Sequence, residues 1–121
     1  KRCENIRWAA RKWLLALSIL VGSMTQTVDE RPVRVHILVA GRVQAVGFRA
    51  FAARTAARLD LVGGVRNLDD GRVELDVEGK RAAIEALLRE LKIGPSAAHV
   101  TKIETEWSAA ADRYSNFSIW Y

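Results

Sequence analysis

The sequence of 121 residues predicts an α+β sandwich of the ferredoxin-like type, in which two helices cover one face of an antiparallel sheet. Three observations predict this fold. Several segments alternate between apolar and polar residues, two others carry one apolar stripe at helical spacing, and the segments follow the order β-α-β-β-α-β with a short strand at the end. Because each stripe is about 100° wide, each helix can bury one side only, against one face of the sheet.

The first strand and the first helix are the clearest elements. Residues 33–40 have a valine or isoleucine at every second position up to residue 39, which predicts a strand with one apolar face. The helix that follows is expected from residue 48 to Asp60. Its apolar stripe consists of Phe48, Phe51, Ala52, Thr55, Ala56 and Leu59.

The second half of the domain repeats this plan. A second strand is expected at residues 65–68 after two glycines, and a hairpin signal at residues 69–71 leads to a third strand that should end at Gly79. The second helix carries its stripe on Ala83, Ile84, Leu87, Leu88 and Leu91. It must stop before Pro95. A fourth strand at residues 99–107 and a last strand at residues 117–121 complete the sheet.

Composition predicts one globular domain without a nucleic-acid partner. Half of the residues are apolar and 27% are charged, which is typical of a folded soluble protein. The net charge of +5 is uneven, because residues 1–23 hold five basic residues and one acidic residue. Residues 24–121 hold fourteen basic and thirteen acidic residues, and these are interspersed. We therefore expect no basic surface for DNA or RNA.

Two other functions of this fold are disfavoured by what the sequence lacks. An RNA-recognition sheet needs aromatic side chains on its central strands, and residues 33–40 and 72–77 contain none. A copper carrier needs soft or imidazole ligands in the first loop, and residues 41–49 contain no Cys, His or acid. Cys3 is the only cysteine, and His36 and His99 have no ligand-like neighbours, so we expect no metal and no cofactor.

The first thirty residues are ambiguous. Residues 13–22 form an apolar run after a basic segment, too short for a membrane span of about 20 residues. Residues 1–23 can be sequence upstream of a start at Met24, a secretory signal, or an interfacial helix. The first predicts a cytoplasmic protein and the second a secreted one. We assign residues 1–31 to an N-terminal extension and residues 32–121 to the functional domain, and expect membrane contact only through residues 13–22.

Residues 41–49, with the sequence GRVQAVGFR, link the first strand to the first helix. Such a loop directs backbone N–H groups and the positive end of a helix toward one point, which suits an anion. Arg49, in the first helical turn, adds a planar cationic group that matches phosphate oxygens. The loop lacks the Lys-Ser/Thr pair of a nucleotide-binding P-loop, so no Mg²⁺ site is expected. Its composition alone also allows a plain connection with Arg49 as a surface charge.

Together with GGVRN at residues 63–67 and DGRVE at residues 70–74, this loop resembles the acylphosphatase family, and the similarity covers roughly residues 33–121. The resemblance implies a monomeric, metal-independent enzyme that hydrolyses small acyl phosphates to a carboxylate and inorganic phosphate. It implies that Arg49 binds the phosphate and that Asn67 orients the attacking water. Backbone N–H groups of the cradle would hold the phosphoryl oxygens, at Gln44, Ala45, Val46, Gly47 and Phe48. A non-catalytic anion-binding or regulatory domain of the same fold is the alternative.

The sequence departs from the family pattern at three positions. Ala45 replaces a glycine, which would cost about 1 kcal/mol if the backbone there needs a positive φ. Gly64 replaces a tryptophan, and the space could be filled by Trp107 or Trp120. Asp60 replaces a glycine after the first helix, where aspartate tolerates a left-handed conformation fairly well.

Overall fold

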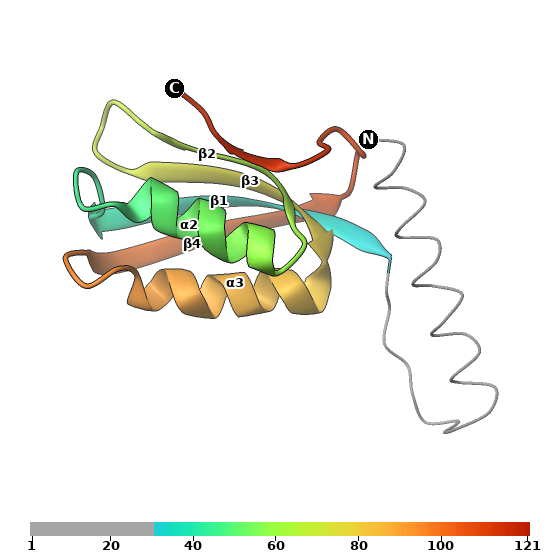
Figure 1. The fold of residues 1–121 in the computed structure, drawn as a ribbon, viewed down its shortest axis with the longest axis horizontal. Helices are drawn as coiled ribbons and strands as arrows, with labels where there is room; N and C mark the ends of the chain where they lie inside the picture. Colours follow the sequence, from blue (N-terminus) through green and yellow to red (C-terminus); the bar gives the residue numbers. More distant parts are fainter. Residues whose placement is uncertain (1–30) are drawn as a thin grey trace, which may run out of the picture.

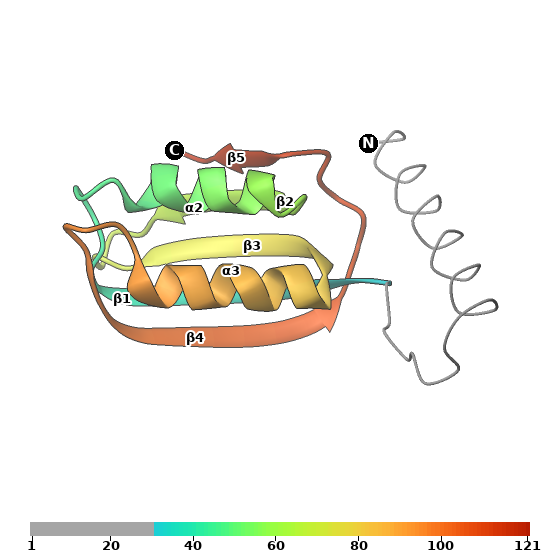
Figure 2. The ribbon, with the colours of Figure 1, turned by 60° about the horizontal axis from the view of Figure 1, so that its bottom comes forward.

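The computed structural model describes residues 31–121, which form a five-stranded sheet with both helices on one face (Figures 1 and 2). The strands are β1 (Pro32–Arg42), β2 (Val62–Asn67), β3 (Val73–Lys80), β4 (His99–Ala109) and β5 (Phe117–Ile119). The helices are α2 (Phe48–Arg58) and α3 (Arg81–Ile93). The apolar run at residues 13–22 and all but the last residue of the predicted extension 1–31 lie outside the described residues.

The sheet confirms the ferredoxin-like fold class, with one addition. Its strand order is β4-β1-β3-β2-β5, and the first four strands pair antiparallel. β5 pairs parallel with β2, with Gly64 opposite Ser118, so the complete sheet is mixed. This pairing places the last strand of the domain on the opposite edge from β4, next to α2 (Figure 2).

The predicted apolar faces form the core. Val35, Ile37 and Val39 of β1 are fully buried, and so are the inward residues of β3. The helix stripes are buried except at Phe51, Leu59, Ala83 and Leu88, which are partly buried against the same core. α2 lies over β2 and β5, whereas α3 lies over β3 and β4. This arrangement follows from the period-2 and period-3.6 patterns, which leave one apolar side on each element.

Among the predicted strand ends that differ from the structure, two lie at glycines, and the last strand also ends at Ile119 rather than at residue 121. β3 does not end at Gly79, because this residue pairs with Val33 of β1 and the strand continues to Lys80. β2 begins at Val62 rather than at residue 65, because Gly63 and Gly64 both pair with β3. A glycine weakens a strand without preventing its ladder hydrogen bonds when neighbouring strands lie on both sides.

Candidate active site

The loop of residues 43–47 joins β1 to the N-terminus of α2, and its backbone has a positive φ at two positions. Gly47, the N-cap of α2, has φ 79°, and Ala45 has φ 62°. The cap makes no side-chain hydrogen bond, and the first turn of α2 holds no acidic residue. The first N–H groups of a helix have no intrahelical partner, and they carry the positive end of the helix dipole. The loop and the first turn therefore present donors and positive potential, as an anion requires.

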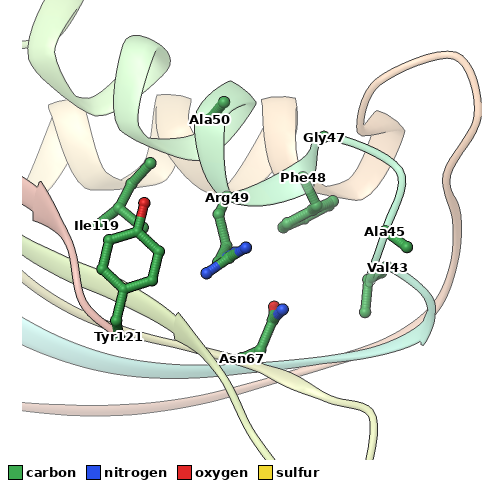
Figure 3. A pocket seen from close by; sticks show the side chains of 9 residues that line it. All are labelled: Val43, Ala45, Gly47, Phe48, Arg49, Ala50, Asn67, Ile119 and Tyr121. Atoms are coloured by element: carbon green, nitrogen blue, oxygen red, sulfur yellow. The ribbon is translucent and has the colours of Figure 1, made fainter.

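Arg49 and Asn67 come from different elements and meet at this helix end. Arg49 is the second residue of α2, and Asn67 is the last residue of β2. Figure 3 shows the two side chains pointing toward one another across a pocket. Asn67 faces the helices because its ladder partner, Val73, is a core residue. Two groups that the sequence places 18 positions apart are thus brought to one site.

The amide of Asn67 has an unused acceptor. Its Oδ1 atom is buried and has no hydrogen-bond partner among residues 31–121. Most buried polar atoms in proteins are hydrogen-bonded, and an exception in a pocket often marks a binding site. An amide oxygen accepts hydrogen bonds, so this atom suits a water or a protonated ligand oxygen.

The pocket has a volume of about 240 Å³, which suits a small ligand. Arg49 supplies the only charge among the residues that line it. The lining residues are Val43, Ala45, Gly47, Phe48, Arg49, Ala50, Asn67, Ile119 and Tyr121. The pocket therefore combines one cation and one neutral amide with a wall that is otherwise apolar or backbone.

The structure places five of the seven predicted site residues at this pocket. Arg49, Asn67, Ala45, Gly47 and Phe48 line it, and the side chain of Phe48 is 1% exposed in the core below.

The other two predicted residues turn away from the pocket. The side chain of Val46 packs against the core cluster. Gln44 directs its side chain to the β2–β3 hairpin, where its Nε2 donates to the carbonyl oxygens of Leu68 and Arg72. Any contribution of Gln44 or Val46 to an anion cradle would come from the backbone.

Sequence reasoning missed one wall of the pocket, which β5 and the end of the chain after it supply. Ile119 lines it, and the ring of Tyr121 lies 5.3 Å from the guanidinium carbon of Arg49 (Figure 3). The alternation at residues 117–121 put Phe117, Ile119 and Tyr121 on one face. That signal indicated a shared face and gave no information on which strand β5 would join.

The sheet face opposite the helices carries an ion-pair network that is separate from the pocket. Asp76 accepts hydrogen bonds from both Arg34 and Tyr114, and Arg113 lies 3.2 Å from the same carboxylate. Burial raises the pKa of Asp76, but the hydrogen bonds outweigh it, and the net pKa is lowered. Burial, together with the hydrogen bond to Asp76, raises the pKa of Tyr114.

Glu74 lies beside this network and pairs with His36. The carboxylate is 2.6 Å from Nε2 of His36 and 2.6 Å from Nε of Arg66. Burial opposes its ionisation, yet these two partners lower its pKa on balance. His36 thus has a structural partner on the open face, and His99 is exposed at the start of β4.

Residues 31–121 contain no group of three or more His, Cys, Asp or Glu side chains that could hold a metal ion. No helix in this part of the chain has the length and apolar character needed to cross a membrane.

The chain has clear relatives. The family model described as Acylphosphatase matches residues 35–119. A protein named Acylphosphatase from Anaeromyxobacter dehalogenans is 52% identical over 87 residues, which cover 72% of this chain and 94% of that protein.

Two of the solved structures that match this fold differ greatly in the share of their own chain that is covered. The crystal structure of acylphosphatase from Bacillus subtilis matches with a TM-score of 0.72 and 39% identity, covering 74% of this chain and 99% of that one. The structure of T. kodakarensis HypF matches with a TM-score of 0.64 and 38% identity, over 72% of this chain and 12% of that much longer one.

Proposed function

The chain belongs to the acylphosphatase family, and from this premise we propose that it hydrolyses acyl phosphates with Arg49 and Asn67 as its two catalytic side chains. Family and fold support acyl phosphate hydrolysis in general. One observation supports the assignment of residues: a guanidinium and an unpartnered amide oxygen share a pocket at the N-terminus of α2.

The phosphoryl group would lie between the loop and Arg49. Three phosphoryl oxygens carry the negative charge, and they match the N–H groups of the loop, the first turn of α2 and the guanidinium. Donors that are already in place stabilise the charge of the transition state without reorganising, which is the main catalytic effect in phosphoryl transfer.

Asn67 would hold the attacking water. Its Oδ1 accepts a hydrogen bond from the water and so turns an oxygen lone pair toward phosphorus. The new bond joins the water oxygen to phosphorus, and the bond from phosphorus to the carboxylate oxygen breaks. The water proton passes to a phosphoryl oxygen, so the products are a carboxylate and dihydrogen phosphate.

This reaction needs neither a general acid nor a metal in our proposal. The leaving group is a carboxylate, which is stable without protonation near neutral pH. Arg49 and the backbone donors provide the positive potential that a metal ion supplies in many phosphoryl-transfer enzymes. Activity should therefore persist in the presence of a chelator such as EDTA.

The test is release of inorganic phosphate from acetyl phosphate by the purified protein, with and without EDTA. Arg49→Gln and Asn67→Ala should each lower kcat by about 10²-fold or more. Arg54→Gln is the matched control, because Arg54 is an exposed arginine on the same helix. If the two site variants fold and keep the wild-type rate, the assignment of residues fails.

The match to HypF supports a second candidate function, because in HypF the matched fold is a small part of a long chain. In that case the domain would bind an anion without turning it over. Binding of inorganic phosphate without any hydrolysis of acetyl phosphate would favour this alternative.

A further inference from the structure

The two halves of the site are joined by one side chain outside the pocket. Nε2 of Gln44 lies 2.8 Å from the carbonyl oxygen of Leu68 and 3.0 Å from that of Arg72. Both partners are acceptors, so the amide nitrogen uses both of its hydrogens here. Gln44 belongs to the loop of residues 43–47, and Leu68 directly follows Asn67.

The hairpin that accepts these hydrogen bonds is also closed by two backbone hydrogen bonds of its own. The N–H of Leu68 donates to the carbonyl oxygen of Arg72 at 2.8 Å, and that of Gly71 donates to the carbonyl oxygen of Leu68 at 3.2 Å. Each carbonyl has two lone pairs, so each can accept one bond from the hairpin and one from Gln44. Removal of the Gln44 amide therefore leaves the hairpin closed and releases it from the loop.

Asn67 depends on this link because no hydrogen bond from the described residues holds its side-chain acceptor directly. Its Oδ1 makes no hydrogen bond within residues 31–121, so its position follows from the backbone at the end of β2. That end of the strand passes straight into the hairpin that Gln44 holds. A shift of the hairpin relative to the loop moves Asn67 relative to Arg49.

We propose that Gln44 is a positioning residue, which acts through Leu68 and Arg72 to fix Asn67 relative to the phosphate-binding loop. The proposal rests on the proposed function, since it concerns the alignment of a bound phosphoryl group with the attacking water. Gln44 is not catalytic, because its side chain contacts the hairpin and does not line the pocket. Misplacement of a reacting group by about 1 Å can cost about 10²-fold in rate.

A double-mutant cycle tests the proposal. Gln44→Met has nearly the same shape without donors, and it is made in the wild-type and in the Asn67→Ala protein. In the wild-type protein we expect kcat for acetyl phosphate to fall about tenfold, while the inhibition constant of inorganic phosphate changes less than about twofold. In the Asn67→Ala protein the same substitution should change kcat less than about twofold, since the side chain it positions is gone.

The possible results separate this inference from the proposed function. An equal loss of kcat in both backgrounds, no loss in either, or a parallel weakening of phosphate inhibition overturns the role of Gln44 and leaves the function intact. No turnover by the unchanged protein overturns both. If Gln44→Met does not fold, Gln44→Asn serves instead, because it keeps the amide and withdraws it by about 1.5 Å from the hairpin. The same outcomes then apply.

Discussion

The indole ring of Trp120 lies directly against the Cα atom of Gly64, in the space that a side chain at position 64 would occupy. The contact is on the sheet face opposite the helices, where Gly64 pairs with Asp76. The ring of Tyr114 contacts that of Trp120 in a tilted arrangement, at a centroid distance of 5.7 Å. The family pattern has a tryptophan at position 64, so here the aromatic ring comes from the adjacent segment. Of the two candidates to fill this space, Trp120 is confirmed, whereas Trp107 stacks on Arg81.

Gly64 and Trp120 should therefore behave as a coupled pair. Gly64→Trp alone should destabilise the protein by about 1–3 kcal/mol, because two large rings compete for one space. Adding Trp120→Gly should recover much of this loss, and the coupling is measured by urea unfolding of the four proteins. Additive effects of the two substitutions would contradict the conclusion that Trp120 occupies the space of a side chain at position 64.

Ala45→Gly should stabilise the protein by about 1 kcal/mol, because φ 62° is unfavourable for alanine and free for glycine. We also expect tighter inhibition by inorganic phosphate, since the loop N–H groups can then adjust to the anion. Asp60→Gly is the control: Asp60 also has a positive φ, of 61°, but lies after the far end of α2. It should leave phosphate inhibition unchanged, and an equal response of both variants would contradict a role of Ala45 in the cradle.

Tyr121→Leu should raise KM for acetyl phosphate about two- to fivefold, which corresponds to the roughly 0.5–1 kcal/mol of an exposed cation–π contact. The ring lies 5.3 Å from the Arg49 guanidinium carbon and would restrict its orientations. Tyr121→Phe keeps the ring and should keep the wild-type KM. Equal kinetics of the Leu and Phe variants would show that the ring does not restrain Arg49.

Acid should destabilise the protein through the network on the open sheet face. The pKa values of Asp76 and Glu74 are lowered in the folded protein, so the unfolded chain binds more protons as the pH falls below about 5. Their contribution is complete above that pH and is lost as the pH falls through the lower folded pKa values.

The variant Asp76→Asn tests this assignment. At pH 7 it should lose about 1–3 kcal/mol, because Arg34 and Tyr114 lose a charged acceptor. Urea unfolding at pH 7 and at lower pH should show a smaller dependence on pH than in the wild-type protein. An unchanged dependence would mean that other carboxylates cause the loss of stability in acid.

The fold was largely predictable because each helix and strand carries its own pattern of apolar residues in the sequence. Two helical stripes and four alternating strands require one arrangement of faces, and the helix that begins at Phe48 puts Arg49 in its first turn whatever else packs around it. Asn67 was predictable only through the family motif, since an asparagine before a hairpin is otherwise a common turn residue.

The remainder of the site depends on contacts between distant segments. The position of Ile119 and Tyr121 requires that β5 join β2 in parallel, and strand alternation does not specify the partner. The direction of the Gln44 side chain could not be predicted either, because a loop residue has no periodicity from which to infer the face it takes.

The parallel pairing of β5 with β2 also has a consequence for the order in which the protein is made. The loop, Arg49 and Asn67 all precede residue 68, whereas the wall of the pocket comes from residues near 119, after the chain has passed through β4 on the opposite edge. During synthesis the half of the site that holds Arg49 and Asn67 therefore leaves the ribosome well before the residues that line the other side of the pocket. The pocket becomes complete only when the last strand of the domain has crossed the molecule and paired.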